Sequence, residues 1–491
     1  MRQMMNPYLP LGVYIPDGEP HVFEGRVYIY GSHDASKATV YCPGNYNVWS
    51  APTGDLTSWR DEGTSYLRRQ DPTNADDRMQ LWAPDAARGA DGRYYLYYCF
   101  PFYPEIGVAV ADRPGGPYEF YAHVHYPDGR TLKEDMPFDP AVLVDDDGRV
   151  YLYYGFCPAE EKEMKLPEFT DEMIAKMSED ERRMVEGLRN IRFGENSMVV
   201  ELEEDMATVK SGPKALIPGG HHTAGTGFEG HGFFEASSIR KFNGMYYFVY
   251  SSHKSHELCY AISEKPDEGF RYGGIIISNG NIGYRGRTKP CYTLSNNHGG
   301  IEKIGNQYYI FYHRGTDGSE YSRQGCAEPI EIRPDGRIDQ VEMTSCGLNG
   351  GPLPAKGIYP AAVCCHMTCP RTMEHIDYQD PVNQEITRIT EDRNEMFVTD
   401  IQDGTVLGYK YFDFQAPACL MLELRGAFEG KVTVSVDEEG AEILGTMELS
   451  ADSDIWEVRN VALTEFRDTA ALFLTFSGRG TLELKSLGFI G

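Results

Sequence analysis

The sequence predicts an all-β protein: a five-bladed β-propeller followed by a C-terminal, jelly-roll-like β-sandwich. Three observations support this prediction. A hairpin-like stretch occurs five times, the copies are unevenly spaced, and the last hundred residues change to a different alternation of apolar and polar residues. The alternative is a run of unrelated hairpins in a single sandwich.

Each of the five copies contains an apolar strand, a turn with glycine, and a second strand rich in aromatic and β-branched residues. The copies begin at Glu19, Ala83, Asp139, Glu235 and Gly299, and their turn glycines are Gly25, Gly92, Gly148, Gly244 and Gly305. The turns are 67, 56, 96 and 61 residues apart. This spacing is too irregular for a solenoid and suits blades with unequal loops. Short strands between the copies, such as "IGVAVAD", predict four strands per blade.

The pattern also predicts the domain boundaries. The propeller is expected to span 1–345, with its closing strand near "NPYLP". A Gly- and Pro-containing linker is expected at 346–384 and the β-sandwich at 385–491. Residues 158–194 are highly charged with Met, Ile and Leu at helical spacing, which predicts a helical insertion. That insertion is either a solvated decoration or a wall near the site.

The amino-acid composition indicates which kinds of binding partner are disfavoured. Lys and Arg total 46 and Asp and Glu 74, a net charge of -28, which disfavours nucleic acid and anionic membranes. We find no apolar run that would make a signal peptide or a membrane span, so a cytoplasmic protein is expected. The eleven cysteines lack disulfide-framework spacing and predict free thiols. "CCHMTC", Cys364 to Cys369, lacks a second ligand pair at the spacing of a zinc finger.

Three carboxylates occupy equivalent places in three blades. Asp17 lies eight residues before its turn glycine, and Asp139 and Glu235 lie nine before theirs. The innermost strands of a propeller line its axis, so these three side chains should meet in one pit. Like charges so close cannot all ionise freely, and some pKa values must rise. A protonated carboxyl beside an ionised one is the arrangement that glycoside hydrolysis requires.

Six stretches in order resemble glycoside hydrolase family 43 over residues 6–340: "NPYLPLGVYIPDGEPHVF", "WAPD", "FDPAVLVDDDGRVYLYYG", "HGFFEASSIRK", "NNHGG" and "FYHRG". The tail, with "VLGYKYFDF", looks like a family 6 carbohydrate-binding module. The resemblance implies a five-bladed propeller that hydrolyses glycosides with inversion. It implies that the substrate is an oligosaccharide derived from plant polysaccharides, that a terminal β-D-xylosyl or α-L-arabinofuranosyl residue is released, and that no cofactor is required.

The resemblance also assigns roles to the acids. Asp17 matches the general base, Asp139 the residue that orients its partner and tunes its pKa, and Glu235 the general acid. The chain has Asp17-Gly-Glu19-Pro where many relatives have Asp-Pro, so Glu19 is the competing candidate for the base.

Four further residues are candidates with an open alternative. Trp82 either stacks on the sugar or belongs to the core. Arg323 resembles the arginine that contacts the base or the substrate, unless it is a surface residue. His231 lies in a glycine-rich loop that binds sugar hydroxyls or, with its neighbouring histidines, a metal. His298 resembles an axial histidine near a hydrated, structural calcium ion, or is a hydrogen-bonded core histidine.

Several other functions remain as alternatives. A β-galactofuranosidase or another exo-glycosidase could use the same fold. A non-catalytic carbohydrate-binding propeller would not need all three acids. The retaining invertase group also has five blades, but its expected nucleophile and acid motifs are replaced here by "PDGEP", "FDP" and "FEA".

Overall fold

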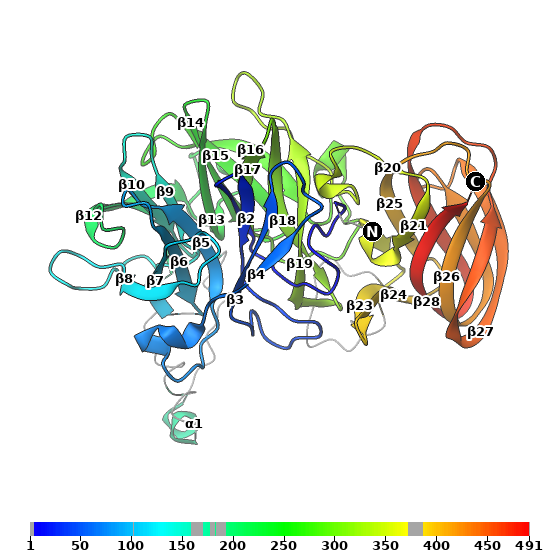
Figure 1. Ribbon diagram of the computed structural model, residues 1–491, viewed down its shortest axis with the longest axis horizontal. Helices are drawn as coiled ribbons and strands as arrows, with labels where there is room; N and C mark the ends of the chain where they lie inside the picture. Colours follow the sequence, from blue (N-terminus) through cyan, green and yellow to red (C-terminus); the bar gives the residue numbers. More distant parts are fainter. Residues whose placement is uncertain are drawn as a thin grey trace.

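The computed structural model describes residues 4–101, 103–158, 170–176, 182, 193–371 and 386–490. Strands dominate, and they form a propeller followed by a sheet-rich C-terminal domain, drawn from yellow to red in Figure 1. The predicted all-β fold with a five-bladed propeller is therefore confirmed. Within the described ranges no helix is long and apolar enough to cross a membrane.

The first three blades are four-stranded antiparallel sheets. Blade one comprises β1 (Glu19–Phe23), β2 (Arg26–Tyr30), β3 (Tyr46–Pro52) and β4 (Arg60–Tyr66). Blade two comprises β5 (Trp82–Arg88), β6 (Tyr94–Phe100), β7 (Tyr103–Ala111) and β8 (Glu119–His123). Blade three comprises β9 (Ala141–Val144), β10 (Val150–Tyr154), β11 (Asn196–Leu202) and β12 (Val209–Pro218).

The last two blades differ in their number of strands. Blade four comprises β13 (Phe233–Phe242), β14 (Met245–Ser252), β15 (Glu257–Ser263) and β16 (Arg271–Ser278). Blade five has β17 (Ile301–Ile304), β18 (Gln307–Thr316) and β19 (Ser319–Ile330). The prediction of four strands per blade is wrong here, because the N-terminal segment takes the fourth place without forming a regular strand. Its Tyr8 N–H donates to Gly325 O, and Asn6 bonds both backbone groups of Ala327.

The innermost strands close a ring around the axis. β1 contacts β5, β5 contacts β9, β9 contacts β13, β13 contacts β17, and β17 contacts β1. The aromatic strands lie one place further out, between two neighbouring blades, and are buried on both faces. In β6, for example, Tyr94, Leu96 and Tyr98 pack against blade one, whereas Tyr95 and Tyr97 pack against blade three. This double burial explains why these strands read as continuous apolar runs.

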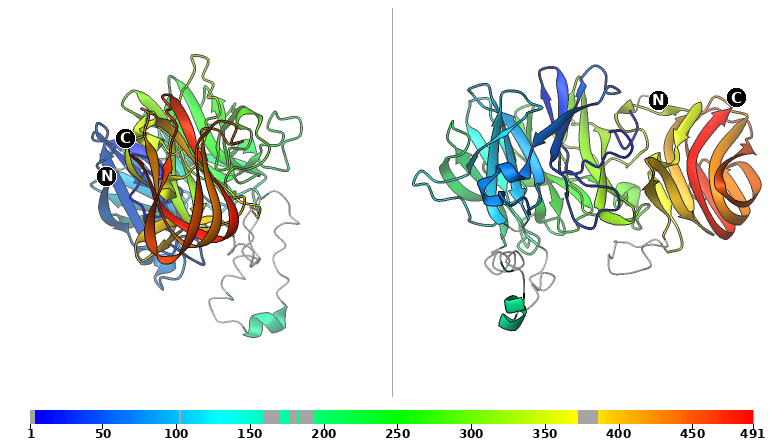
Figure 2. Two further views of the ribbon diagram at one scale, coloured as in Figure 1. Left: turned by 90° about the vertical axis from the view of Figure 1, so that its right-hand side faces the viewer. Right: turned by 60° about the horizontal axis from the view of Figure 1, so that its bottom comes forward.

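Short helices lie outside the sheets. The 3-10 helices in the connecting loops are Arg68–Gln70, Pro72–Asn74, Tyr284–Gly286, Gly347–Asn349 and Ala361–Val363. Within the insertion predicted at 158–194, α1 (Asp171–Lys176) is helical, and most of the remaining insertion lies outside the described residues. The two ribbon views in Figure 2 show α1 well separated from the propeller. The eleven cysteines are all free thiols, as expected.

The C-terminal domain is one hydrogen-bonded network of nine strands. Its strands are β20 (Leu353–Pro354), β21 (Gly357–Pro360), β22 (His366–Thr368), β23 (Arg388–Asp392), β24 (Glu395–Ile401), β25 (Val406–Asp413), β26 (Cys419–Ser435), β27 (Ile443–Ala462) and β28 (Thr469–Ile490). The linker expected at 346–384 is wrong for 353–368, because those residues supply three strands that pair with β25 and β28. These strands have two to four residues, too few for an alternation to be visible.

The two domains share one apolar core. Buried residues of blades four and five, such as Tyr260 and Tyr312, belong to the same cluster as Leu407 and Leu422 of the C-terminal domain. Arg314 is fully buried at this contact, and its guanidinium donates to the backbone carbonyls of Ala362 and Cys364. Cys364, Cys365 and Cys369 fill buried positions and belong to no group of three potential metal ligands among the described residues.

Candidate active site

The three predicted acids occupy one end of the innermost strands. Asp17 and Asp139 each lie two residues before a strand, β1 and β9, and Glu235 is the third residue of β13. Asp17 and Asp139 have φ values of 55° and 45°, in the left-handed region that aspartate tolerates better than most residues. Such backbone geometry is common where a side chain must be aimed at a functional site.

A pocket of about 250 Å³ lies at this end of the axis. It is lined by Asp17, Tyr41, Cys42, Trp82, Ala83, Phe138, Asp139, Phe156, Phe234, Glu235, Ser255, Asn296, His298, Glu320 and Arg323. All three acids therefore face one cavity, and aromatic rings form much of its wall. A wall of this kind suits the alternating polar and apolar faces of a sugar.

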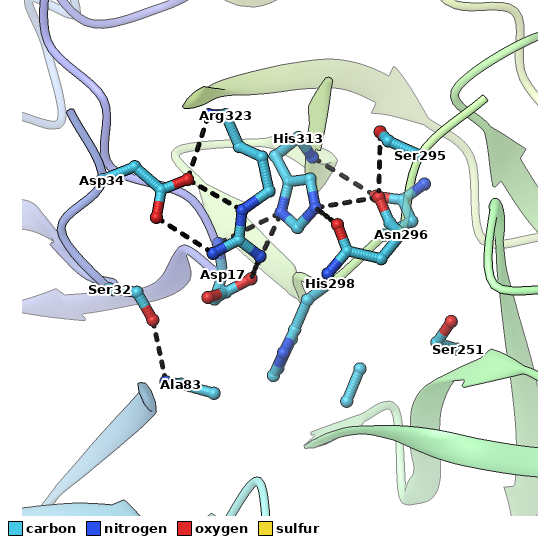
Figure 3. Close-up of polar contacts among 12 residues, drawn as sticks. Asp17, Ser32, Asp34, Ala83, Ser251, Ser295, Asn296, His298, His313 and Arg323 are labelled. Carbon is cyan, nitrogen blue, oxygen red and sulfur yellow. Dashed lines mark hydrogen bonds and ion pairs between the residues drawn. The ribbon is translucent and has the colours of Figure 1, made fainter. Parts of the chain in front are cut away.

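Asp17 is held as an anion by its partners (Figure 3). Arg323 Nη1 lies 3.0 Å from Asp17 Oδ1, while Arg323 Nε and Nη2 are bound by Asp34. Burial alone would raise the pKa of Asp17, but the charge of Arg323, helped by a hydrogen bond from Ser32, outweighs burial and lowers it. Arg323 is itself almost fully buried, so its attraction is little screened. Glu19, the competing candidate for the base, is bound to Arg240 and does not line the pocket.

His313 fixes the backbone of Asp17. The Asp17 N–H donates to His313 Nδ1 at 3.2 Å, and Nε2 of the same ring lies 2.9 Å from Asn296 O. Nε2 must therefore carry the hydrogen, because the carbonyl can only accept. Burial lowers the pKa of His313 to about 3, so the ring is neutral. This neutral tautomer orients the aspartate without adding a charge to the pocket.

Asp139 and Glu235 have raised pKa values. Burial and the neighbouring Asp17 raise the pKa of Asp139, and burial followed by Asp139 raises the pKa of Glu235 well above its usual range. The Ala236 N–H donates to Asp139 Oδ2 at 3.0 Å, which favours the ionised form of Asp139. No hydrogen bond to the Glu235 carboxyl is found within the described residues. The shared proton therefore belongs on Glu235.

His298 lies in the pocket wall, with Nδ1 3.7 Å from Asp139 Oδ2. Burial lowers its pKa to about 4, so it is neutral. Calcium requires six to eight ligands, most of them oxygens. No group of three candidate ligands among the described residues contains His298, and the carboxylate nearest to it accepts the Ala236 N–H. The residues present do not form a calcium site by themselves.

The remaining predicted residues divide into two sets. Trp82 and Arg323 line the pocket as expected. His231 does not line the pocket, so the expected contact with sugar is wrong. Its ring is hydrogen-bonded to Glu257 and stacked on Tyr272, outside the pocket lining. No motif in the sequence points to this partner, which lies 26 residues further along the chain.

Asp34 and His313 were missed as site residues. Asp34 lies nine residues after Gly25, and His313 lies eight residues after Gly305. The three acids precede their own turn glycines by the same eight or nine residues. The two strands of a hairpin have their far ends side by side, so a polar residue eight or nine positions after the turn returns to the end of the hairpin that carries the acid. That symmetry could have identified both residues from the sequence.

Comparison with known proteins agrees with this fold and site. The family profile for glycosyl hydrolases family 43 matches residues 15–197. A xylosidase/arabinosidase of Thermoclostridium stercorarium is 42% identical over 99% of this chain and 98% of its own length, and one of Bacteroides ovatus is 30% identical over 68% and 97%. The structure of a Xanthomonas citri GH43_1 enzyme complexed with xylose is 26% identical, covers 71% of this chain and 96% of its own, and has a TM-score of 0.51.

The propeller with converging carboxylates thus defines an enzyme of the glycoside hydrolase class. The chain belongs to glycosyl hydrolases family 43.

Proposed function

We propose that the protein removes terminal β-D-xylosyl or α-L-arabinofuranosyl residues from oligosaccharides, by a single displacement that inverts the anomeric centre. The proposal is carried by one observation: Asp17, whose pKa is lowered, and Glu235, whose pKa is raised, face the same small axial pocket. The names of the two relatives above and the xylose bound to the Xanthomonas citri enzyme support a pentose substrate.

The size of the pocket supports action at a chain end. Its volume of about 250 Å³ lies below the ~300–1,000 Å³ typical of pockets that enclose larger ligands. A pocket of this size on the propeller axis suits a single terminal sugar. Trp82, Phe138 and Phe234 would pack against its apolar face.

Asp17 would act as the general base. Its lowered pKa keeps it ionised at neutral pH, and Arg323 and His313 fix its orientation. An ionised carboxylate can accept a proton from water as that water attacks the anomeric carbon. The leaving oxygen, on the opposite face of the sugar, needs a proton at the same time.

Glu235 would supply that proton, and Asp139 would keep it available. The negative charge of Asp139 disfavours ionisation of Glu235. The N–H of Ala236, the residue after Glu235 in β13, holds the Asp139 carboxylate beside this strand. Proton donation and water activation are thus assigned to different blades. In an inverting enzyme the two carboxyls are separated by ~6.5–9.5 Å, which leaves room for the water.

A panel of aryl glycosides tests the substrate and proton NMR tests the mechanism. Aryl β-D-xyloside and α-L-arabinofuranoside should be hydrolysed, β-galactofuranoside should not, and Asp17→Asn should remove the activity. The first sugar detected should have the opposite anomeric configuration to the substrate. Retention of configuration, or activity on the galactofuranoside alone, would contradict the proposal.

A further inference from the structure

A second group of metal-ligating side chains lies in blade four, outside the pocket. His231 Nδ1 lies 2.6 Å from Glu257 Oε1 and 3.8 Å from Cys259 Sγ, and that sulfur lies 3.6 Å from the same carboxylate oxygen. His231 ends the loop before β13, whereas Glu257 and Cys259 are the first and third residues of β15. Alternate residues of a strand share a face, so both side chains project toward the loop.

We propose that His231, Glu257 and Cys259 form a site for zinc or a similar divalent transition metal. Zinc ligands in proteins are imidazole nitrogen, thiolate sulfur and carboxylate oxygen, at ~2.0–2.3 Å. Around a tetrahedral ion such ligand atoms are about 3.3–3.5 Å apart. The two separations to sulfur are already within a few tenths of an ångström of that range. Only the nitrogen and the oxygen need to move apart, by about 0.7 Å.

The carboxylate of Glu257 supplies an independent indication of a missing ligand. Its side chain is 1% exposed, and Oε2 has no hydrogen-bond partner among the described residues. Ser252 Oγ donates to Oε1 at 2.7 Å, the oxygen that also faces His231 and Cys259, so an ion between these ligands would engage Oε1 together with the unpaired Oε2. Burying an unpaired carboxylate oxygen is costly, and a metal ion would remove that cost.

The surroundings hold the ligands in place and leave a path to solvent. The His231 ring is stacked on Tyr272, with centroids 5.1 Å apart and planes 14° apart. The His231 side chain is 21% exposed, so an ion can enter from that side. Lys254 Nζ lies 3.6 Å from the Glu257 carboxylate, but its side chain is 38% exposed and can turn toward solvent.

Charge and protons balance on binding. The Cys259 thiol releases its proton to solvent. The His231 hydrogen, which Nδ1 donates to Glu257 in the metal-free site, moves to Nε2 by exchange with solvent, so that the Nδ1 lone pair faces the ion. The Glu257 carboxylate is already ionised. The thiolate and the carboxylate offset the two positive charges, which gives a neutral site, and one position of the ion is left for water.

The site would tie the 219–232 loop to blade four. This loop leads directly into β13, which carries Phe234 and Glu235 of the pocket. The His253 N–H donates to Gly232 O, and the Tyr250 hydroxyl donates to His231 O, so the end of the loop already rests on β14 and the turn after it. A bound ion would therefore stabilise the loop without taking part in the hydrolysis. This role does not depend on which sugar the enzyme releases.

Cobalt binding to the metal-free full-length protein tests the site. Co²⁺ bound by a thiolate in tetrahedral geometry gives an intense visible spectrum and a thiolate charge-transfer band. We expect one equivalent to bind with this signature and zinc to displace it. Cys259→Ser should remove the charge-transfer band, and His231→Gln should weaken binding at least tenfold. Both variants should retain the circular dichroism and the cooperative unfolding of the parent.

Cys419→Ser is the matched control, because Cys419 is the most exposed cysteine and is therefore the first candidate for adventitious binding. It should leave the spectrum unchanged. Absence of stoichiometric cobalt binding would overturn the proposal. So would a charge-transfer band that survives in Cys259→Ser and disappears in Cys419→Ser.

Discussion

Asp139 and Glu235 share a buried environment but differ in their hydrogen bonds. Asp139 accepts the Ala236 N–H, and no donor to Glu235 is found within the described residues. A backbone N–H stabilises an ionised carboxylate, so the two residues divide the roles of charge and proton. Their titrations are coupled, and the pH profile of the enzyme should report the pair.

Asp139→Asn should therefore move the alkaline limb of the kcat/KM profile to lower pH. Without the neighbouring negative charge the pKa of Glu235 falls, and its protonated form is lost earlier as pH rises. A limb that moves by about one pH unit would correspond to ~1.4 kcal/mol of lost coupling between the two carboxyls. Asp128→Asn, at an exposed turn, should leave the profile unchanged. An alkaline limb that stays in place in Asp139→Asn and moves in Asp17→Asn would assign the tuning role to Asp17.

The sequence could predict the three acids because each has a fixed position relative to a turn glycine. It could not predict their electrostatic partners with the same certainty. Arg323 lies 306 residues from Asp17 along the chain, and Asp34 lies 289 residues from Arg323. Only closure of the propeller, which places blade five beside blade one, brings these charges together.

At the scale of elements, the β18–β19 turn links the pocket to the C-terminal domain. Asp317 in this turn accepts hydrogen bonds from Lys37 N at 3.0 Å and Thr390 Oγ1 at 2.7 Å. Its own N–H donates to Ile389 O at 2.8 Å. The strand that follows carries Glu320 and Arg323 into the pocket wall. The turn should therefore fix the position of that wall.

Asp317→Ala should lower kcat/KM several-fold and lower the free energy of unfolding by about 1–3 kcal/mol. The lost hydrogen bonds, at ~0.5–1.5 kcal/mol each, release the turn while the buried core stays intact. Steady-state kinetics and thermal unfolding measure the two quantities. Asp335→Ala is the matched control, since Asp335 caps an equivalent turn by accepting the Arg337 N–H at an exposed site. Equal effects of the two substitutions on kcat/KM would contradict this role.

Whether the sequence predicts a strand depends on the length of the strand and on the residues of its turn. The five hairpins were predictable because all five turn glycines adopt the positive φ that L side chains rarely adopt, between 63° and 85°. Short strands such as β20 and β22 pair only because the C-terminal sheet offers free edges. Nothing in two or three residues distinguishes such a strand from a linker.

At the scale of the whole molecule, the C-terminal domain acts as a structural partner of the propeller. It shares the core of blades four and five, and Arg314 crosses the boundary. Trp456, the sole tryptophan of this domain, is covered by Arg425, whose guanidinium carbon lies 4.3 Å from the ring centroid, and by Lys485. The residue is half-buried, and both cations lie over its ring.

A chain truncated after residue 345 should therefore lose cooperative unfolding and activity together. Truncation exposes the apolar side chains of blades four and five and leaves the Arg314 guanidinium without its carbonyl partners. Circular dichroism melting and the aryl glycoside assay measure the outcome. Arg314→Met in the full chain removes only the polar contact. This variant should still unfold cooperatively, but at a lower Tm. A truncated protein that is folded and fully active would contradict a shared core.

The central claim is that Asp17 activates water and Glu235 protonates the leaving group, and the dependence on leaving group tests it most directly. A dinitrophenyl glycoside needs no protonation as it departs. Glu235→Gln should therefore regain much of its lost kcat on this substrate relative to an alkyl glycoside. Asp17→Asn should stay inactive on both, because its water is still not activated. Recovery of Asp17→Asn with no recovery of Glu235→Gln would show that the two roles are assigned the wrong way round.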